Sequence, residues 1–532
     1  MLQKHFRYIF ILLTVTLIGC AKRGNITGGA KDTLSPVLVS SFPKNFSTNF
    51  KEKVIRLNFD EYVKLKDLSK QLVVSPPMNT PPEVTPSNAS KYLTIKIKDT
   101  LKENTTYSFN FGQSIQDNNE NNPYSQFRYV FSTGTYIDSL SIEGTIKDAR
   151  ELTTDSFVKV MLFEINETYT DSTIYKERPR YVTNTLDSLT TFKIDNIKAG
   201  TYQLIALKEE NNNYKFDPAT DRIGFHSTPI TIPTDEKFQL QLFDEVLNFK
   251  ALKPSQAGDG KLVMGYEGIP SDIKTVLKNG NEIIPTIVTR IPEKDSVNIW
   301  YKPIKVDSLS ITVSKDKFVK DFVIKLKNQK KDSLSITPVQ SGVLRPRERF
   351  TLKSVTPLIK FDNSKITLLK KDSTAIPFTT KYDEFEQKLE FDFERKELER
   401  YTFRILPGAM TDFFERENDT LTFAVSTREM ADYGSLTLNL TNVKQYPVIV
   451  ELTDAKGKIL ASEYSEDSPT IIFEGLDPND FTVRIIYDAN KNRQWDPGNF
   501  LEKRQAEEII YFKTTLGIRS NWVWREDFDL GG

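Results

Sequence analysis

The stretch Phe127-Arg-Tyr-Val-Phe-Ser-Thr-Gly134 carries the pattern that decides the fold. Its aromatic residues fall at every second position, and a short polar turn sequence ends it. Because successive side chains of a β-strand point to opposite faces of a sheet, this spacing predicts a strand with one buried face. The same period recurs in Tyr107-Ser-Phe-Asn-Phe111 and along most of the chain, and helical spacing is better only around residues 395–400. The sequence therefore predicts an all-β protein.

The length and charge of the chain limit what it can be. Its 532 residues are too many for one hydrophobic core, so we expect roughly four or five domains. The 72 Lys and Arg residues balance 72 Asp and Glu residues, and removing residues 1–19, with Lys4 and Arg7, leaves 70 against 72. Charges this evenly balanced create no field that attracts nucleic acid, so we expect no nucleic-acid partner.

Residues 35–135 carry a family resemblance in four features. These are Phe59-Asp-Glu61 after an early strand, Thr105-Thr-Tyr107 at the start of a later one, Asp117 in the loop that follows, and the closing Phe131-Ser-Thr-Gly134. Together they resemble the bacterial Ig-like domain found in surface-layer proteins. The resemblance implies a β-sandwich that acts as a spacer or adhesion module rather than as an enzyme.

Residues 136–250 resemble a different module. Residues 192–207 contain a strand, a Gly turn and a second strand, and a loop rich in Asn and acidic residues follows. That order is similar to the prealbumin-like or carboxypeptidase-regulatory-like β-sandwich. The resemblance implies an accessory module without catalytic activity.

Both patterns recur later in the chain, which predicts a duplicated architecture. Asp412 follows Tyr401 by 11 residues, much as Asp117 follows Tyr107 by 10. We therefore expect tandem β-sandwiches after residue 250. They comprise a β-rich module of unassigned family at 251–340, a second Ig-like domain at 341–428 and a second prealbumin-like sandwich at 429–532.

The first 19 residues have the form of a secretory signal peptide, with a basic start and a short apolar run. The run, residues 8–18, is much shorter than the ~20 residues needed to span a bilayer as a helix. Leu17-Ile-Gly-Cys20 then resembles the lipobox of bacterial lipoproteins. The resemblance implies cleavage before Cys20 and lipid on both its thiol and the new amino terminus. A plain signal peptide followed by a chance cysteine is the alternative.

The residues after Cys20 bear on location. Residues 20–34 are polar and rich in glycine, which predicts a flexible tether. Lys22 and Arg23 stand where some Gram-negative bacteria place an acidic signal for surface lipoproteins. We therefore expect a cell-envelope protein, an outer-membrane lipoprotein that faces the periplasm rather than the cell surface. Its expected partners are the membrane, through the lipid, and another cell-envelope protein.

Two loops, one in each prealbumin-like region, carry side-chain oxygens at matching positions. Alternating oxygen ligands suit a hard cation such as Ca²⁺, and the pattern resembles the first part of an EF-hand-type loop. It lacks the Gly at position 6 and the Glu at position 12. The alternative is a set of Asx-turns, in which Asn and Asp side chains cap their own backbone. The candidate calcium ligands are Glu209, Asn211, Asn213 and Asp217 in the first loop, and Asp488, Asn490, Asn492 and Asp496 in the second.

Histidine and cysteine are too scarce to build most catalytic sites, and although acidic residues are plentiful, nothing in the sequence singles out a catalytic pair. After residue 19 the chain holds one histidine, His226, and one cysteine, Cys20, which cannot form a zinc site of the His/Cys kind. We therefore predict a lipid-anchored, non-catalytic protein with a structural or protein-interaction role. The alternative is a surface glycan-binding lipoprotein, in which an exposed aromatic platform stacks on sugars. The tryptophans considered for that platform are Trp300, Trp495, Trp522 and Trp524.

Overall fold

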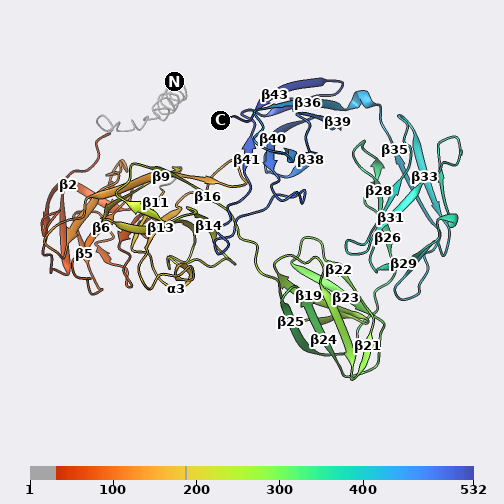
Figure 1. The fold of residues 1–532 in the computed structure, drawn as a ribbon, viewed down its shortest axis with the longest axis horizontal. Helices are drawn as coiled ribbons and strands as arrows, with labels where there is room; N and C mark the ends of the chain where they lie inside the picture. Colours follow the sequence, from red (N-terminus) through yellow and green to blue (C-terminus); the bar gives the residue numbers. More distant parts are fainter. Residues whose placement is uncertain (1–31, 186–188, 532) are drawn as a thin grey trace, which may run out of the picture. The chain divides into compact units, whose positions relative to one another are not determined.

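The computed structural model describes residues 32–185 and 189–531, and nearly all of their regular secondary structure is β-strand (Figure 1). The prediction of an all-β chain of sandwich modules is confirmed. Cys20 and the signal peptide lie outside the described residues. In the part of the chain that is described, no helix is both long enough and apolar enough to cross a bilayer.

The described chain divides into two compact units, and the division runs through the second sandwich. The first unit contains residues 32–141, 180–185 and 194–198, and the second contains the remainder.

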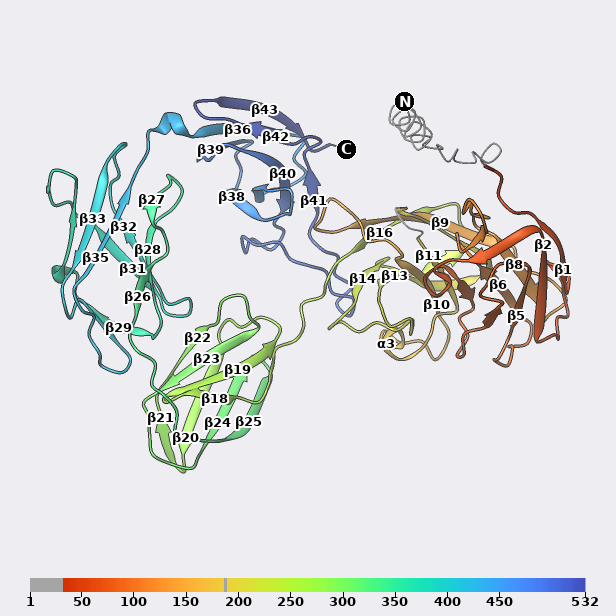
Figure 2. The ribbon, with the colours of Figure 1, turned by 180° about the vertical axis from the view of Figure 1, so that it is seen from behind.

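The first sandwich packs two sheets around an aromatic core. One sheet has the strand order β1-β2-β5-β4, and the other has β3-β6-β8. Phe109, Tyr129 and Phe131 alternate inward from β6 and β8, as the sequence pattern predicts, and pack with Ile55 and Leu57 of β2. Figure 2 shows β1 at the rim of this sandwich. The strands are β1 (Leu38–Phe42), β2 (Val54–Leu65), β3 (Val73–Ser75), β4 (Glu83–Thr85), β5 (Ser90–Lys96), β6 (Thr106–Asn110), β7 (Ile115–Asp117) and β8 (Arg128–Ser132).

The second sandwich is marked by a parallel strand pair. Its β9 (Leu140–Asp148) and β16 (Lys237–Leu242) run parallel, with Glu143 opposite Lys237. In the facing sheet, β10 (Lys159–Glu164) and β14 (Arg222–Phe225) flank β13 (Gly200–Lys208), and both are antiparallel to it. The short helix α3 (Thr173–Lys176) lies in a connection.

The middle module is a sandwich of its own. One sheet contains β19 (Lys261–Glu267), β22 (Thr286–Arg290) and β23 (Ser296–Tyr301). The facing sheet has the order β21-β20-β24-β25. Inward-facing apolar residues of the two sheets form one continuous core. The strands of the facing sheet are β20 (Lys274–Asn279), β21 (Glu282–Ile284), β24 (Ser308–Lys315) and β25 (Phe318–Lys325).

The fourth sandwich repeats local features of the first. Residues 395–399, where the sequence favours a helix, form a loop that leads into β33 (Arg400–Ile405). Tertiary packing overrides the local spacing, because Tyr401, Phe403 and Ile405 alternate into the core. The remaining strands are β26 (Ile336–Pro338), β27 (Gly342–Val343), β28 (Phe350–Ser354), β29 (Leu358–Phe361), β30 (Ile366–Leu369), β31 (Thr379–Asp383), β32 (Lys388–Asp392), β34 (Met410–Asp412) and β35 (Leu421–Ser426).

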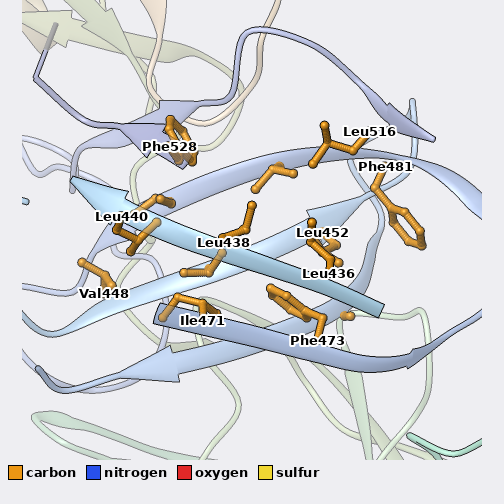
Figure 3. Close-up of a cluster of buried hydrophobic side chains, with 14 of the residues drawn as sticks. Leu436, Leu438, Leu440, Val448, Leu452, Ile471, Phe473, Phe481, Leu516 and Phe528 are labelled. Atoms are coloured by element: carbon orange, nitrogen blue, oxygen red, sulfur yellow. The ribbon is translucent and has the colours of Figure 1, made fainter. Parts of the chain in front are cut away.

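The last sandwich has the same kind of parallel pair as the second. Its β36 (Gly434–Thr441) lies between β39 (Thr470–Leu476) and the parallel β43 (Val523–Asp529). Leu436, Leu438 and Leu440 point from β36 into the core that Figure 3 shows. The facing sheet contains β37 (Val448–Thr453), β38 (Ile459–Ser465), β40 (Asn479–Tyr487) and β41 (Ile509–Tyr511). The predicted domain boundaries themselves stay a prediction.

Candidate functional site: the paired Asp/Asn loops and the contact beside them

The first predicted calcium loop, residues 209–217 (loop A), already holds a cation of its own. The carboxylate of Glu209 is buried, and its Oε1 lies 2.6 Å from the ammonium of Lys159 on β10. That ammonium also donates to Oδ1 of Asn212 at 2.7 Å. Burial lowers the pKa of Lys159, although Glu209 opposes the shift. The lysine thus neutralises the loop where a metal ion would otherwise be needed.

Two further side chains of loop A accept hydrogen bonds from backbone N–H groups of the same loop region. Oδ1 of Asn213 accepts from the backbone N–H of Lys215 at 2.8 Å, and Oδ1 of Asp217 accepts from that of Ala219 at 3.0 Å. Asn211 is exposed. These are the Asx-turns that the sequence offers as the alternative to calcium ligation.

The second loop, residues 488–496 (loop B), has no such lysine. In the strand register of the second sandwich, Lys159 lies opposite Leu207, two residues before loop A. In the last sandwich, Ile486 lies two residues before loop B, and the residue opposite it is Ile449. An apolar residue therefore stands where loop A has its lysine. Asp488 is fully buried and accepts from the backbone N–H groups of Asn492 and Arg493 at 3.1 and 2.9 Å.

The amides of loop B gather around its last aspartate. Nδ2 of Asn490 and of Asn492 donate to the same oxygen of Asp496, at 2.5 and 2.7 Å. Glu507, which the sequence analysis missed, accepts from the backbone N–H of Asp496 at 3.1 Å. Burial raises the pKa of Glu507, and the charges of Asp496 and Asp488 act in the same direction, against two backbone donors. Glu507 lies outside the loop in sequence, so no local spacing could have revealed it.

Within the described residues, no group of three or more His, Cys, Asp and Glu side chains is arranged to hold a metal ion. The structure gathers the loop residues through hydrogen bonds among themselves. Calcium at these loops stays a prediction, and loop B, which lacks a lysine at the matching strand position, suits it better than loop A.

Loop B leads directly into an arm, residues 497–505, that contacts the second sandwich. Phe500 at its tip is 0% exposed, and its ring meets that of Phe225 edge to face at 5.2 Å. Gly498 allows the close approach, because a Cβ there would lie 2.3 Å from the ring of Phe243. The backbone N–H of Phe500 donates to Glu245 at 2.5 Å, and burial raises the pKa of that carboxyl.

Polar contacts flank this aromatic anchor. Nε2 of Gln505 donates to the carbonyl of Phe225 at 3.0 Å and to Oγ of Ser227 at 3.1 Å. The ammonium of Lys503 lies 2.6 Å from Asp171. A buried ring surrounded by satisfied polar groups is the anatomy of a specific protein interface.

A second patch joins the same two sandwiches. The side chain of Arg484 is buried and pairs with Glu451 at 2.7 Å. Its guanidinium and the hydroxyl of Tyr511 both donate to the carbonyl of Arg150. The guanidinium of Arg150 lies over the ring of Trp495, 5.3 Å from its centroid. Loop B and its arm are therefore part of the contact between the second and the last sandwich.

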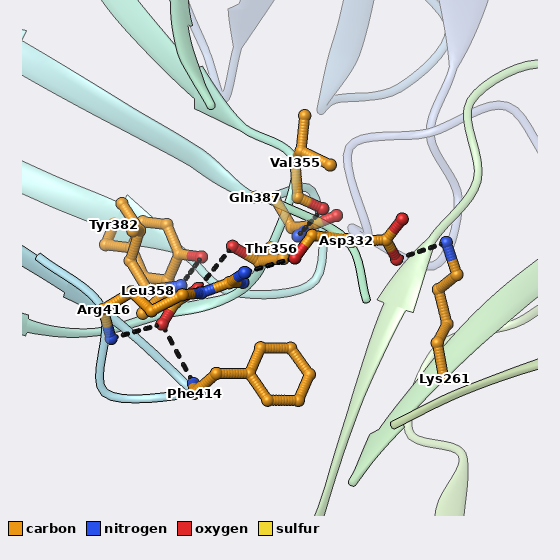
Figure 4. A network of polar contacts seen from close by, with 10 residues as sticks. Lys261, Asp332, Val355, Thr356, Leu358, Tyr382, Gln387, Phe414 and Arg416 are labelled. Carbon is orange, nitrogen blue, oxygen red and sulfur yellow. Dashed lines mark hydrogen bonds and ion pairs between the residues drawn. The ribbon is translucent and has the colours of Figure 1, made fainter. Parts of the chain in front are cut away.

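A separate network joins the middle module to the fourth sandwich (Figure 4). Asp412 at the end of β34 is fully buried and binds the guanidinium of Arg416, with Nη2 at 2.6 Å. Arg416 also donates to the carbonyl of Asp332, whose carboxylate lies 2.6 Å from the ammonium of Lys261 on β19. Phe414, in the same turn, meets the buried ring of Trp300 edge to face.

The tryptophans considered for sugar binding lie in different surroundings. Trp300 is buried in the middle module and Trp495 lies beneath Arg150, so neither forms an open platform. Trp522 is 51% exposed, and its ring lies 17° from parallel with that of Trp524. His226 is partly buried, and its Nδ1 lies 2.8 Å from the carbonyl of Thr228.

Comparison with known proteins identifies the first sandwich. Residues 32–133, fewer than half of the chain, match the model of the bacterial Ig-like domain family. No curated protein matches the chain.

Three solved structures illustrate how weakly their folds overlap with the whole chain. One is surface layer protein SbsC, domains 1–6, at 13% identity, covering 85% of this chain and 64% of that chain with a TM-score of 0.15. The titin domains A168–A170 share 11% identity over 46% of this chain and 90% of theirs, also with a TM-score of 0.15. A Salmonella alpha-2-macroglobulin shares 9% identity over 90% of this chain and 42% of its own, with the same score.

Proposed function

Because residues 32–133 form a bacterial Ig-like domain, we propose that this chain is a lipid-anchored protein of the cell envelope with a structural or protein-interaction role and no catalytic activity. The observation that carries the proposal is the way the modules are held together. Buried aromatic and ionic contacts join the second sandwich to the last, and a polar network joins the middle module to the fourth. Contacts of this kind limit movement between the modules they join, which suits a protein that binds its partners through several modules at once.

The anchor in this proposal is Cys20. A lipobox-like Leu17-Ile-Gly-Cys20 supports it, and two or more acyl chains hold a protein to a bilayer firmly, whereas one chain binds only marginally. Lys22 and Arg23 favour a periplasm-facing position in the outer membrane. The proposed partner is another protein of the envelope.

Membrane fractionation tests this function. We expect the wild-type protein to incorporate radiolabelled palmitate and to sediment with outer membranes. The Cys20→Ala variant should lose both properties, whereas Thr27→Ala in the same tether should keep both. Retention of Cys20→Ala in the membrane would show that lipid on this residue is not the anchor.

Protease treatment of intact cells tests the orientation. A periplasm-facing protein should resist digestion until the outer membrane is opened. Digestion on intact cells would overturn that orientation and would favour the second candidate function.

The second candidate is a surface glycan-binding lipoprotein, favoured by one observation. Trp522 is exposed and lies nearly parallel to Trp524, 5.9 Å between centroids, so the pair offers aromatic surface to a sugar. On a glycan array, Trp522→Ala should abolish any binding, whereas Val523→Ala, which removes a neighbouring exposed side chain, should not. Equal loss in both variants would contradict a role for the tryptophan.

A further inference from the structure

The edge of the first sandwich that follows the tether exposes several large apolar side chains close together in sequence. Five large apolar side chains within 13 residues are exposed, Phe42 by 73% and Phe46 by 61%. Leu38, the first residue of β1, packs on the core instead. The strand therefore has some side chains that face the core and others that face solvent. The exposed set, which we call the β1 strip, consists of Leu34, Val37, Val39, Phe42 and Phe46.

The strip ends in a corner whose backbone is held by hydrogen bonds of Asn45. Phe42, Lys44 and Phe46 are exposed, and Asn45 between them is tied down. Its Nδ2 donates to the carbonyl of Arg128 at 3.1 Å, and its Oδ1 accepts from the backbone N–H of Val130 at 2.8 Å. These hydrogen bonds hold the backbone of the corner, from which two aromatic side chains and one lysine project into solvent.

Backbone strain at this corner points to a use for it. Phe46 has φ of +62°, a left-handed conformation that is unfavourable for a bulky side chain. The N–H of Phe46 donates to the carbonyl of Val130 at 2.8 Å, which helps to hold this conformation. Strain of this kind persists where surrounding structure imposes it, and it concentrates at binding sites. Here it holds a phenyl ring in solvent, where the ring itself gains nothing.

We propose that the β1 strip lies in the interfacial region of the phospholipid bilayer that carries the lipid of Cys20. This inference rests on the proposed lipid anchor and adds a second point of membrane contact. The chain from Cys20 to Leu34 spans at most about 50 Å, so the strip stays near the surface of the bilayer. Aromatic rings and lysine are the side chains that settle at the boundary between headgroups and acyl chains, and Lys44 pairs with lipid phosphate.

Site-directed fluorescence tests the contact in the whole lipidated protein. Cys20 is the only cysteine, so once it is lipidated an introduced cysteine is the single free thiol. Phe42→Cys is compared with Val319→Cys, an exposed position on β25 of the middle module. Both carry an environment-sensitive dye in vesicles of phosphatidylethanolamine and phosphatidylglycerol. We expect a lipid-borne quencher to act at least about twofold more strongly at position 42, and aqueous iodide to prefer position 319.

Equal quenching at the two positions would overturn the proposal. Shielding of position 42 from both quenchers would also overturn it, and would show that a protein surface or a second copy of the chain covers the strip. Mass spectrometry of the amino terminus reports lipidation separately, so failure of the anchor is recognised independently.

If Cys20 proves to carry no lipid, flotation of a lipid-free chain with vesicles tests whether the β1 strip binds a bilayer. Protein beginning at residue 21 should co-float with the same vesicles, and Phe42→Ser with Phe46→Asn should reduce co-flotation about fivefold or more. Asn is chosen because it tolerates the left-handed backbone at position 46. Val319→Ser with Val323→Ser is the matched control and should leave co-flotation unchanged; an equal loss in the control, or no loss in either pair, would contradict the proposal.

Discussion

A buried aspartate organises the same kind of turn in the first and fourth sandwiches. Asp117 accepts hydrogen bonds from four successive backbone N–H groups, residues 119–122, at 2.6 to 3.2 Å. Asp412 accepts from the N–H groups of Phe414 and Arg416 and from the hydroxyl of Thr356. The tyrosines that precede them match as well, because Tyr107 and Tyr401 each accept from the N–H five residues upstream. The sequence recurrence therefore reflects shared local chemistry.

Replacing Asp117 should lower the stability of the first sandwich at neutral pH and should weaken the dependence of that stability on acid pH. Burial alone raises the pKa of this carboxyl, but the four N–H donors outweigh burial and leave the pKa below its ordinary value. Its stabilising effect is therefore complete above about pH 4 and is lost as pH falls through the lowered native pKa. Asp117→Asn should cost about 1–3 kcal/mol at pH 7, because its Nδ2 faces donors, and should flatten the acid dependence.

Hydrogen–deuterium exchange of peptides covering residues 105–133, corrected for the intrinsic effect of pH, measures this change. Glu103→Gln, at an exposed position of the same module, is the control. Acid dependence that persists unchanged in Asp117→Asn would show that other carboxyl groups cause it.

Loops A and B should differ in their response to calcium. The ammonium of Lys159 neutralises Glu209 in loop A, whereas an apolar residue holds the matching strand position beside loop B. In calorimetric titration, we expect Asp496→Asn to abolish any calcium binding that the wild type shows, and Asp217→Asn to retain it. Loss of binding in Asp217→Asn would reverse the assignment.

At the scale of elements, the arm of residues 497–505 should depend on Phe500. This ring is fully buried against Phe225, whereas the next residue, Leu501, is 58% exposed. Phe500→Ala should cost about 3–5 kcal/mol of local stability, because it leaves a cavity between the two sandwiches. Leu501→Ala should cost less than about 0.5 kcal/mol. Limited proteolysis within the arm should accelerate only in Phe500→Ala; equal rates in both variants would show that the ring does not anchor it.

Much of the fold could be predicted from the sequence, because a half-buried strand is recognised by the alternation of apolar and polar residues along it. The spacing of Tyr401, Phe403 and Ile405 sufficed for β33, and the turn aspartates could be matched by position. The contacts of Phe500 could not be predicted, since a single aromatic residue after a Pro-Gly turn has no periodicity. The same holds for Lys159, whose partner Glu209 is 50 residues away and is set by strand register.

At the scale of the whole molecule, the contact between the second and last sandwiches should restrict motion of the modules between them. Two patches, one around Phe500 and one around Arg484, join the same pair of sandwiches. Spin labels at Leu152→Cys and Ile459→Cys, both exposed positions, should give a narrow distance distribution. Adding Phe500→Ala should broaden it, whereas adding Leu501→Ala should not. A broad distribution in the otherwise unaltered chain would contradict a persistent contact.

The parallel strand pair of the last sandwich affects the order in which this sandwich can fold during synthesis. A polypeptide is made from its amino terminus, so β36 emerges first and its parallel neighbour β43 emerges only after every other strand of that sandwich. Leu436, Leu438 and Leu440 must therefore wait for Phe528 and Leu530 before their core is complete. During that interval one edge of β36 has no strand to pair with, and such edges invite pairing with other chains. A chaperone that covers this nascent edge would protect the chain until β43 has paired with β36.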